Sequence, residues 1–148
     1  MGVIGSGGFG SVYLVKKKGS VVTESTGKSH SSFAMKVIPK KELHESGSVS
    51  SLILEKKIQT ELKNDFIVSL KYSFQDKKSC FMVMEYAPGG DAYSFIHNPK
   101  HPEKVQMFRE LGEEGPKFVM ACVVLALEQL HSRNIMYRDL KLENVLVF

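Results

Sequence analysis

The chain has 148 residues, of which 43% are hydrophobic and 24% charged, and its formal net charge is +4 at pH 7. These values are typical of one globular domain and exclude a disordered or low-complexity chain. The longest unbroken apolar run, residues 118–127, is too short to span a bilayer, so we expect no membrane partner.

The positive charge is spread along the whole sequence. The densest basic run, Lys16–Lys18, is more typical of a solvated strand end than of a nucleic-acid site, and no groove-reading motif or aromatic platform accompanies it. We therefore expect no nucleic-acid partner. Cys80 and Cys122 lie in apolar stretches without metal-ligand or redox spacing, which favours reduced core residues of a cytoplasmic or nuclear protein.

The N-terminal residues carry no signal-peptide pattern. Gly2 with Ser6 fits the myristoylation pattern. The simpler interpretation, which we favour, is a strand whose turn needs Gly5.

Residues 3–15, VIGSGGFGSVYLV, carry glycines in the G-x-G-x-x-G spacing at Gly5, Gly7 and Gly10. Glycines at this spacing let the backbone approach phosphates, but several folds share them. The flanking residues are strand-like, which predicts a strand–loop–strand hairpin. A dinucleotide fold would need a helix after the glycines and a later acid, and neither is present. The TGKS string at 26–29 lacks the glycine that a Walker loop needs at position 22, where Val22 stands.

A polar connection over 16–32 precedes the strand predicted for FAMKVI, residues 33–38. A period of two places Ala34, Lys36 and Ile38 on one face. A lysine within an apolar strand usually extends to solvent at an edge. Here a phosphate-cradling hairpin precedes it, so a lysine that reaches the phosphates of a nucleotide explains both features.

Residues 45–62 predict a helix, with Leu54, Ile58 and Leu62 as its buried stripe. Glu55 lies at the edge of that stripe and is the best candidate to hold Lys36. Two strands are expected next, over 66–74 and 79–87, joined by a turn at 75–78. APGGD at 87–91 then indicates a hinge between a strand-rich half and a helical half.

Five features of the sequence, in this order, resemble the signature set of the eukaryotic protein kinases. They are the glycine loop, Lys36, Glu55, the segment MEYAPGG and the string YRDLKLEN at 137–144. Lys141 in RDLKLEN resembles the serine/threonine type. YRD together with MVMEYAPGGD is similar to the AGC group around the cyclic-nucleotide-dependent kinases. The resemblance implies an α+β fold: an antiparallel N-lobe of five strands with its helix (1–86), a hinge (87–91) and the start of a helical C-lobe (92–148).

The resemblance also implies ATP and Mg²⁺ as cofactors and assigns residue roles. Lys36, held by Glu55, would bind phosphates, Asp139 would orient the substrate hydroxyl, and Lys141 would neutralise the moving phosphoryl group. Asn144 would be a magnesium ligand. Asp91, which also belongs to the expected nucleotide site, and Glu143 would attract an arginine that precedes the target serine or threonine of a protein substrate. The other nucleotide-binding residues would be Ile4, Gly5, Ser6, Gly7, Gly8, Phe9, Gly10, Val12, Ala34, Met82, Glu85, Ala87 and Leu146.

Three features depart from the kinase pattern. Gln59 stands where an apolar residue is usual behind Glu55, and 97–111 is longer than the usual link between helices. The Asp-Phe-Gly aspartate, the activation loop and the remaining helices would follow Phe148, so we expect a truncated kinase domain with little turnover alone. Helix 118–127 reads as buried on every side and would be left bare. The alternative to an enzyme is a non-catalytic kinase-like module that binds a nucleotide or a scaffold partner.

Overall fold

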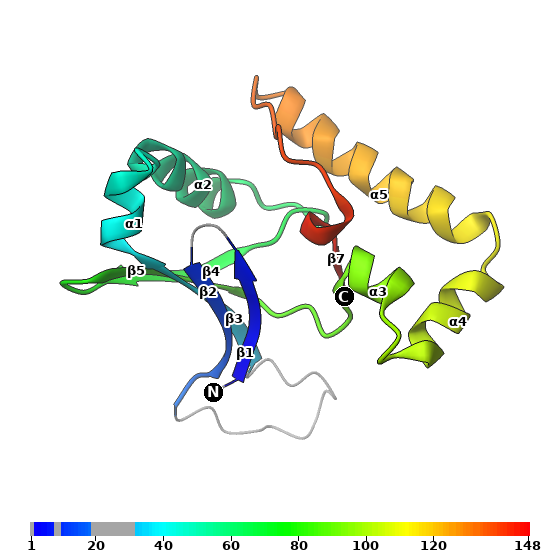
Figure 1. Cartoon of the computed structure of the whole chain (residues 1–148). Helices are drawn as coiled ribbons and strands as arrows, with labels where there is room; N and C mark the ends of the chain where they lie inside the picture. Colours follow the sequence, from blue (N-terminus) through cyan, green and yellow to red (C-terminus); the bar gives the residue numbers. More distant parts are fainter. Residues whose placement is uncertain (1, 8–9, 19–31) are drawn as a thin grey trace. The chain divides into compact units, whose positions relative to one another are not determined.

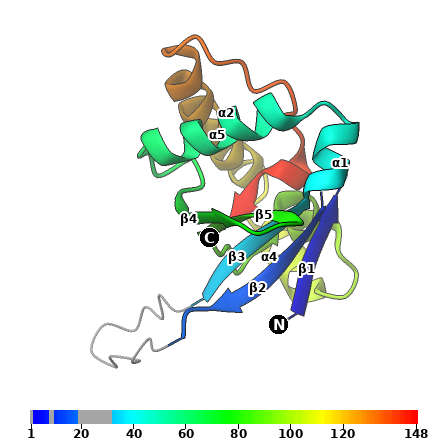
Figure 2. The same ribbon diagram turned by 90° about the vertical axis from the view of Figure 1, so that its left-hand side faces the viewer.

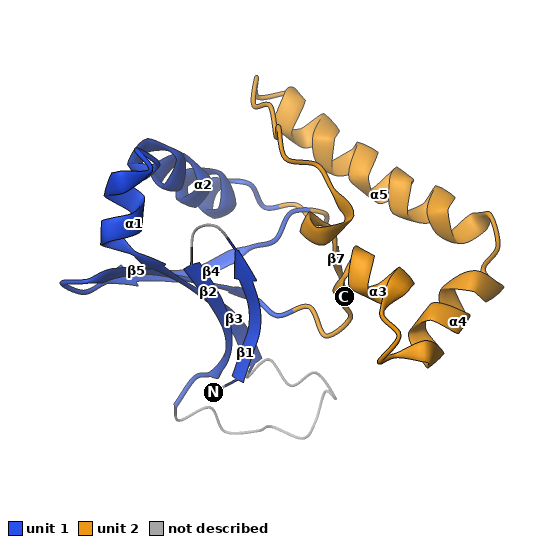
Figure 3. Ribbon diagram, in the orientation of Figure 1, with its two compact units in different colours: residues 1–63, 67–86 blue, residues 64–66, 87–148 orange. Residues whose placement is uncertain are grey.

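The structure, a computed structural model, describes residues 2–7, 10–18 and 32–148. It divides into two compact units (Figure 3). Unit 1 comprises 1–63 and 67–86, and unit 2 comprises 64–66 and 87–148. The main division, between Tyr86 and Ala87, falls at the start of the predicted hinge.

Unit 1 is built on an antiparallel sheet of five strands in the order β1-β2-β3-β5-β4 (Figure 1). This is the sheet that the kinase resemblance implies. Its strands are β1 (Gly2–Gly7), β2 (Gly10–Lys16), β3 (Ser32–Pro39), β4 (Leu70–Gln75) and β5 (Ser79–Glu85).

The core of unit 1 lies between this sheet and the two helices α1 (Lys40–Glu45) and α2 (Val49–Glu61), which both lie on one side of the sheet (Figure 2). Ile38, Leu43 and Met82 form its centre, and Ile38 is only 1% exposed. Lys36 and Ile38 are two residues apart on β3, so their side chains lie on the same face of the sheet. The buried Ile38 therefore packs into the core next to Lys36.

The helix predicted over 45–62 is present but begins later, at Val49, and the shorter helix that precedes it was not predicted. Helix α1 spans Lys40–Glu45 and helix α2 spans Val49–Glu61. Gly47 between them has φ +65°, a backbone conformation that glycine adopts without steric cost. The N–H groups of Ser46 and Gly47 bond to carbonyls of α1, which ends that helix.

The predicted buried stripe of α2 is also partly wrong. Leu54 is 50% exposed, whereas Leu52 packs against the core and Leu62 is buried. Residues 52, 55, 59 and 62 follow one another at spacings of three and four, so they share a face of the helix. Glu55 therefore lies within the inward face rather than at its edge.

The fourth strand is shorter than predicted. It begins at Leu70 rather than at residue 66, since Asn64 Oδ1 accepts the N–H of Phe66 in a turn. The predicted turn before β5 is present: Asp76 Oδ1 accepts the N–H groups of Lys78 and Ser79 at 2.7 Å each.

Unit 2 is mostly helical. The link over 97–111 contains a helix of its own, which explains its length. The elements of unit 2 are β6 (Gly90–Asp91), α3 (Ala92–His97), α4 (Pro102–Glu110), α5 (Glu114–His131), the 3-10 turn η1 (Leu142–Asn144) and β7 (Leu146–Val147).

Helix α5 contains the apolar run 118–127, which was expected to be buried on every side in a whole kinase domain. In this chain Phe118 is 71% exposed and Val124 58%, while Val123 and Leu130 are buried. Only one face of α5 is therefore covered within unit 2. In the described part of the chain no helix is long and apolar enough to cross a membrane.

Candidate functional site

Lys36 and Glu55 form an ion pair in unit 1. Lys36 projects from β3, and its Nζ donates to Glu55 Oε1 at 2.8 Å and to Oε2 at 3.1 Å. The side chains are 24% and 37% exposed, so the pair is partly shielded but open to a ligand. A lysine ammonium held by one carboxylate keeps further donors for an anionic group.

The face of the sheet around Lys36 carries small and apolar side chains. Val12 on β2 and Met82 on β5 are the cross-strand partners of Lys36, and Ala34 precedes it by two residues on β3. Met82 is 2% exposed. The register therefore places four of the predicted nucleotide-binding residues on one face, where an apolar surface flanks a cation.

A small cavity of about 50 Å³ opens beside the ion pair within unit 1. It is lined by Lys36, Glu55, Ile38 and residues of α1 and α2, including Ser48 and Ser51. The two serines did not stand out in the sequence, because they reach the pair only after the chain forms the separate helix α2.

The glycine hairpin pairs β1 with β2. Gly10 has φ +121°, and a Cβ there would overlap the carbonyl oxygen of Val37 on β3. No other residue fits this position without moving β3. Gly8 and Phe9 lie outside the described residues. The remaining predicted residues of the hairpin lie on β1 and are Ile4, Gly5, Ser6 and Gly7.

Glu85 is the last residue of β5, and its N–H donates to the Ser69 carbonyl at 3.3 Å. Ala87, which begins the second part of unit 2, is 7% exposed. Both were predicted to bind a base through their backbones, and this role stays a prediction.

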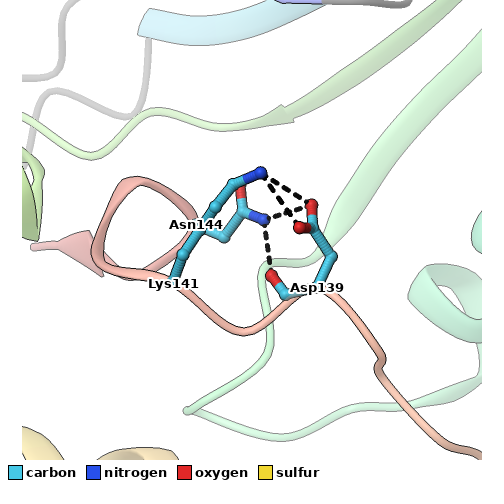
Figure 4. A network of polar contacts seen from close by, with 3 residues as sticks. All are labelled: Asp139, Lys141 and Asn144. Atoms are coloured by element: carbon cyan, nitrogen blue, oxygen red, sulfur yellow. Dashed lines mark hydrogen bonds and ion pairs between the residues drawn. The ribbon is translucent and has the colours of Figure 1, made fainter.

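A second polar cluster lies in unit 2 on the loop 137–144. Lys141 Nζ pairs with Asp139 Oδ1 at 2.9 Å and Oδ2 at 3.1 Å (Figure 4). Asn144 Nδ2 donates to the Asp139 backbone carbonyl and to Oδ2, both at 2.8 Å. Arg138 takes φ +62° beside them, which turns the chain sharply just before the aspartate. Two predicted residues of this loop, Lys141 and Asn144, thus converge on the carboxylate of a third, Asp139.

These contacts shift the ionisation of the cluster. The hydrogen bonds from Lys141 and Asn144 lower the pKa of Asp139 below 3.8. The same hydrogen bond to Asp139, together with its negative charge, raises the pKa of Lys141. Near neutral pH the cluster therefore holds a carboxylate and an ammonium.

The loop is anchored by the short β6–β7 ladder, which pairs Gly90 with Val147 and Asp91 with Leu146. Gly89 N–H donates to the Val147 carbonyl at 2.9 Å, and a Cβ at Gly89 would meet that same oxygen at 2.5 Å. Because Gly89 has no Cβ, its backbone can approach Val147 closely, and this contact fixes the chain just after the loop 137–144.

Asp91 and Glu143 were predicted to attract a substrate arginine. Asp91 caps α3, since its Oδ1 accepts the Ser94 N–H at 2.8 Å. Glu143 lies exposed in η1 between Lys141 and Asn144. Neither side chain is buried in the core, so both are accessible to a substrate.

The described residues include no group of three or more His, Cys, Asp or Glu side chains that could hold a metal ion. The donor chemistry of Asn144 nevertheless fits one ligand position. Its Nδ2 is committed to Asp139, which leaves the amide oxygen as a hard donor of the kind that Mg²⁺ prefers. Phosphate oxygens and waters commonly complete such sites.

The sequence-predicted residues therefore form two clusters. The structure brings Lys36, Glu55, Val12, Ala34 and Met82 together in unit 1. It brings Asp139, Lys141 and Asn144 together in unit 2 and places Asp91 beside Leu146. The residues of each cluster belong to one unit.

Comparison with known proteins gives a consistent result. The family model described as the protein kinase domain matches residues 1–148. Protein kinase 3 of Dictyostelium discoideum is 39% identical over 145 residues, which cover 98% of this chain and 14% of that protein. Serine/threonine-protein kinase ppk22 of Schizosaccharomyces pombe is 37% identical over 146 residues, 98% of this chain and 24% of that protein.

A cGMP-dependent protein kinase of Drosophila melanogaster, isozyme 2 forms cD5/T2, is 37% identical over 144 residues. The match covers 97% of this chain and 14% of that protein. The chain thus spans only a minor part of the length of these curated relatives.

Proposed function

Because this chain belongs to the protein kinase family, we propose that it forms the ATP-binding and catalytic-loop part of a serine/threonine protein kinase. The reaction is transfer of the γ-phosphoryl group of ATP to a serine or threonine hydroxyl of a protein. The observation that carries the proposal is the convergence of Lys141 and Asn144 on Asp139, together with the Lys36–Glu55 pair.

Phosphoryl transfer requires mainly positioning and charge neutralisation. In unit 1, Lys36 would hold nucleotide phosphates, and Glu55 would keep its ammonium in place. The apolar face formed by Val12, Ala34 and Met82 would contact the base, since cofactor pockets combine apolar walls with a few polar groups.

In unit 2, Asp139 would accept a hydrogen bond from the substrate hydroxyl and orient its oxygen. A carboxylate with a lowered pKa remains ionised, so it can take this hydrogen bond throughout the physiological range. The substrate proton would pass to an Asp139 oxygen as the bond from the substrate oxygen to the γ-phosphorus forms, the bond from that phosphorus to the β–γ bridging oxygen breaks, and ADP leaves. Lys141 would neutralise charge on the transferring group.

Magnesium would supply charge neutralisation at the ATP phosphates, and Asn144 would provide one oxygen ligand. Besides phosphate oxygens and waters, Mg²⁺ at ATP is usually bound by one or two carboxylates, whereas Asn144 supplies only an amide oxygen. We therefore propose that the complete enzyme contains a further acidic ligand in an Asp-Phe-Gly segment.

The finer parts of the proposal concern the group, the substrate and the location. Similarity to a cGMP-dependent protein kinase supports placement in the AGC group. Asp91 and Glu143 would favour arginine upstream of the target residue through charge-assisted hydrogen bonds. The free cysteines Cys80 and Cys122 favour a reducing compartment, the cytoplasm or the nucleus.

The experiment compares Lys36→Met and Asp139→Asn in the full protein that carries this chain. Lys36→Met should weaken ATP binding and abolish transfer. Asp139→Asn should abolish transfer while leaving the ATP dissociation constant nearly unchanged. Lys41→Met is the matched control, because Lys41 is exposed and forms an ion pair with Glu45, at 3.8 Å, on the surface of α1.

The outcomes separate the two candidate functions. Loss of ATP binding in both site variants would contradict the division of roles between the two units. A wild-type protein that binds ATP but transfers no phosphate to any peptide would favour the non-catalytic module.

A further inference from the structure

Lys71 occupies an irregular position of β4. Leu70 pairs with Met84 and Tyr72 pairs with Val83, so one extra residue of β4 is inserted between two consecutive residues of β5. This insertion is a β-bulge at Lys71. Bulges change the direction of a side chain and are frequent beside functional sites.

Regular alternation would separate Lys71 from Glu85. Tyr72 shares a sheet face with its partner Val83 and hence with Glu85, two residues on, whereas its neighbour Lys71 would point to the opposite face. The bulge cancels this alternation locally. It lets the Lys71 ammonium reach the carboxylate at the end of β5.

Three polar contacts connect the bulge with Glu85. Lys71 Nζ forms an ion pair with Glu85 Oε1. It also donates to Ser69 Oγ at 3.1 Å, and the Glu85 N–H donates to the Ser69 carbonyl at 3.3 Å. Glu85 is thus held through both its side chain and its backbone by a three-residue segment of unit 1.

We propose that Lys71 is a positioning residue for nucleotide binding, which acts by fixing Glu85 and so the backbone that presents hydrogen-bonding groups to the base. The inference rests on the proposed function, in which Glu85 contributes to the base site. It goes beyond that function by assigning a role to a residue outside the kinase signature motifs. The bulge is the local device that places Lys71 there.

The contribution of Lys71 should be moderate. The two side chains are 38% and 40% exposed, and exposed pairs are weakened by solvent and by salt. Removing the lysine should therefore raise the dissociation constant of ADP about two- to fivefold at low salt. The effect should shrink at high salt.

The test measures binding of ADP and of inorganic tripolyphosphate to the full protein that carries this chain, by calorimetric titration. Lys71→Ala should weaken ADP binding and leave tripolyphosphate binding unchanged, because the triphosphate has no base. Lys71→Glu should weaken ADP binding more, since it opposes Glu85 with a like charge. Lys71→Arg should retain affinity, and the swap Lys71→Glu with Glu85→Lys should restore it in part.

Lys41→Ala is the control, since Lys41 belongs to a more exposed ion pair with Glu45 on α1, a helix that does not include the β4 bulge. Unchanged ADP affinity in both Lys71→Ala and Lys71→Glu would overturn the proposal. Equal weakening of ADP and tripolyphosphate with a lowered Tm would assign Lys71 a general structural role and overturn it as well. Failure of the wild-type chain to bind ADP would instead refute the proposed function, and the inference with it.

Discussion

Replacing Gln59 with methionine should stabilise unit 1. Gln59 lies on α2 one turn after Glu55, and its Oε1 is buried without a hydrogen-bond partner among the described residues. A buried amide oxygen loses its water without compensation. Methionine has a similar length and shape, and its flexible thioether fills irregular space.

The expected gain follows from the cost of the unpaired oxygen. An unsatisfied buried polar group costs about 1–3 kcal/mol. Part of this gain is offset. A buried methionine side chain loses rotamer freedom, and the substitution also removes the amide nitrogen of Gln59 together with any contacts that it makes. We expect a net gain of about 1 kcal/mol, which corresponds to a rise in Tm of about 4–8 °C for a unit of this size.

The assay is thermal unfolding followed by calorimetry, with hydrogen exchange of the α2 amides as a local measure. Gln106→Met is the matched control, because Gln106 on α4 is exposed and bonds to Glu110. It should change stability by less than about 0.5 kcal/mol. A Gln59→Met variant no more stable than the wild type, with unchanged exchange in α2, would refute the reasoning.

Three further predictions concern the site. Lys141→Met removes the main cause of the lowered pKa of Asp139. The pKa should therefore rise back toward the ordinary value of an aspartate, and the acid limb of the pH–rate profile should move to higher pH. An unmoved limb would contradict this. Gly10→Ala should lower stability by about 2 kcal/mol or more through overlap with the Val37 carbonyl, as measured by urea unfolding. Asp91→Asn should keep the α3 cap and Tm while peptide arrays show roughly tenfold weaker preference for upstream arginine.

Much of the candidate site could be predicted from the sequence because its residues belong to short segments. The glycine spacing, the strand around Lys36 and the string from Asp139 to Asn144 each depend on local chemistry. Gly10 is required by a close approach of backbone that no side chain allows. The order of these segments was enough to predict the kinase family, which the family model over 1–148 confirms.

The inward face of α2 depended on tertiary contacts. Its position is determined by the Lys36–Glu55 pair and by packing of Leu52 on the core. Leu54 is more hydrophobic than Glu55, so hydrophobicity alone wrongly placed Leu54 in the buried stripe, although Leu62 is buried and Glu55 does hold Lys36 as predicted. The break at Gly47 was also missed, because an isolated glycine in a helical pattern does not by itself show whether the helix ends there.

The contact between Lys71 and Glu85 was decided by the tertiary structure alone. Strand alternation predicts opposite faces of the sheet for Lys71 and Glu85, because Tyr72 shares a face with its partner Val83, and only the bulge overrides it. A bulge depends on how two strands pair, which involves residues more than ten positions apart. Local sequence chemistry therefore determined which groups the site contains, and the pairing of strands and helices decided which of these groups meet.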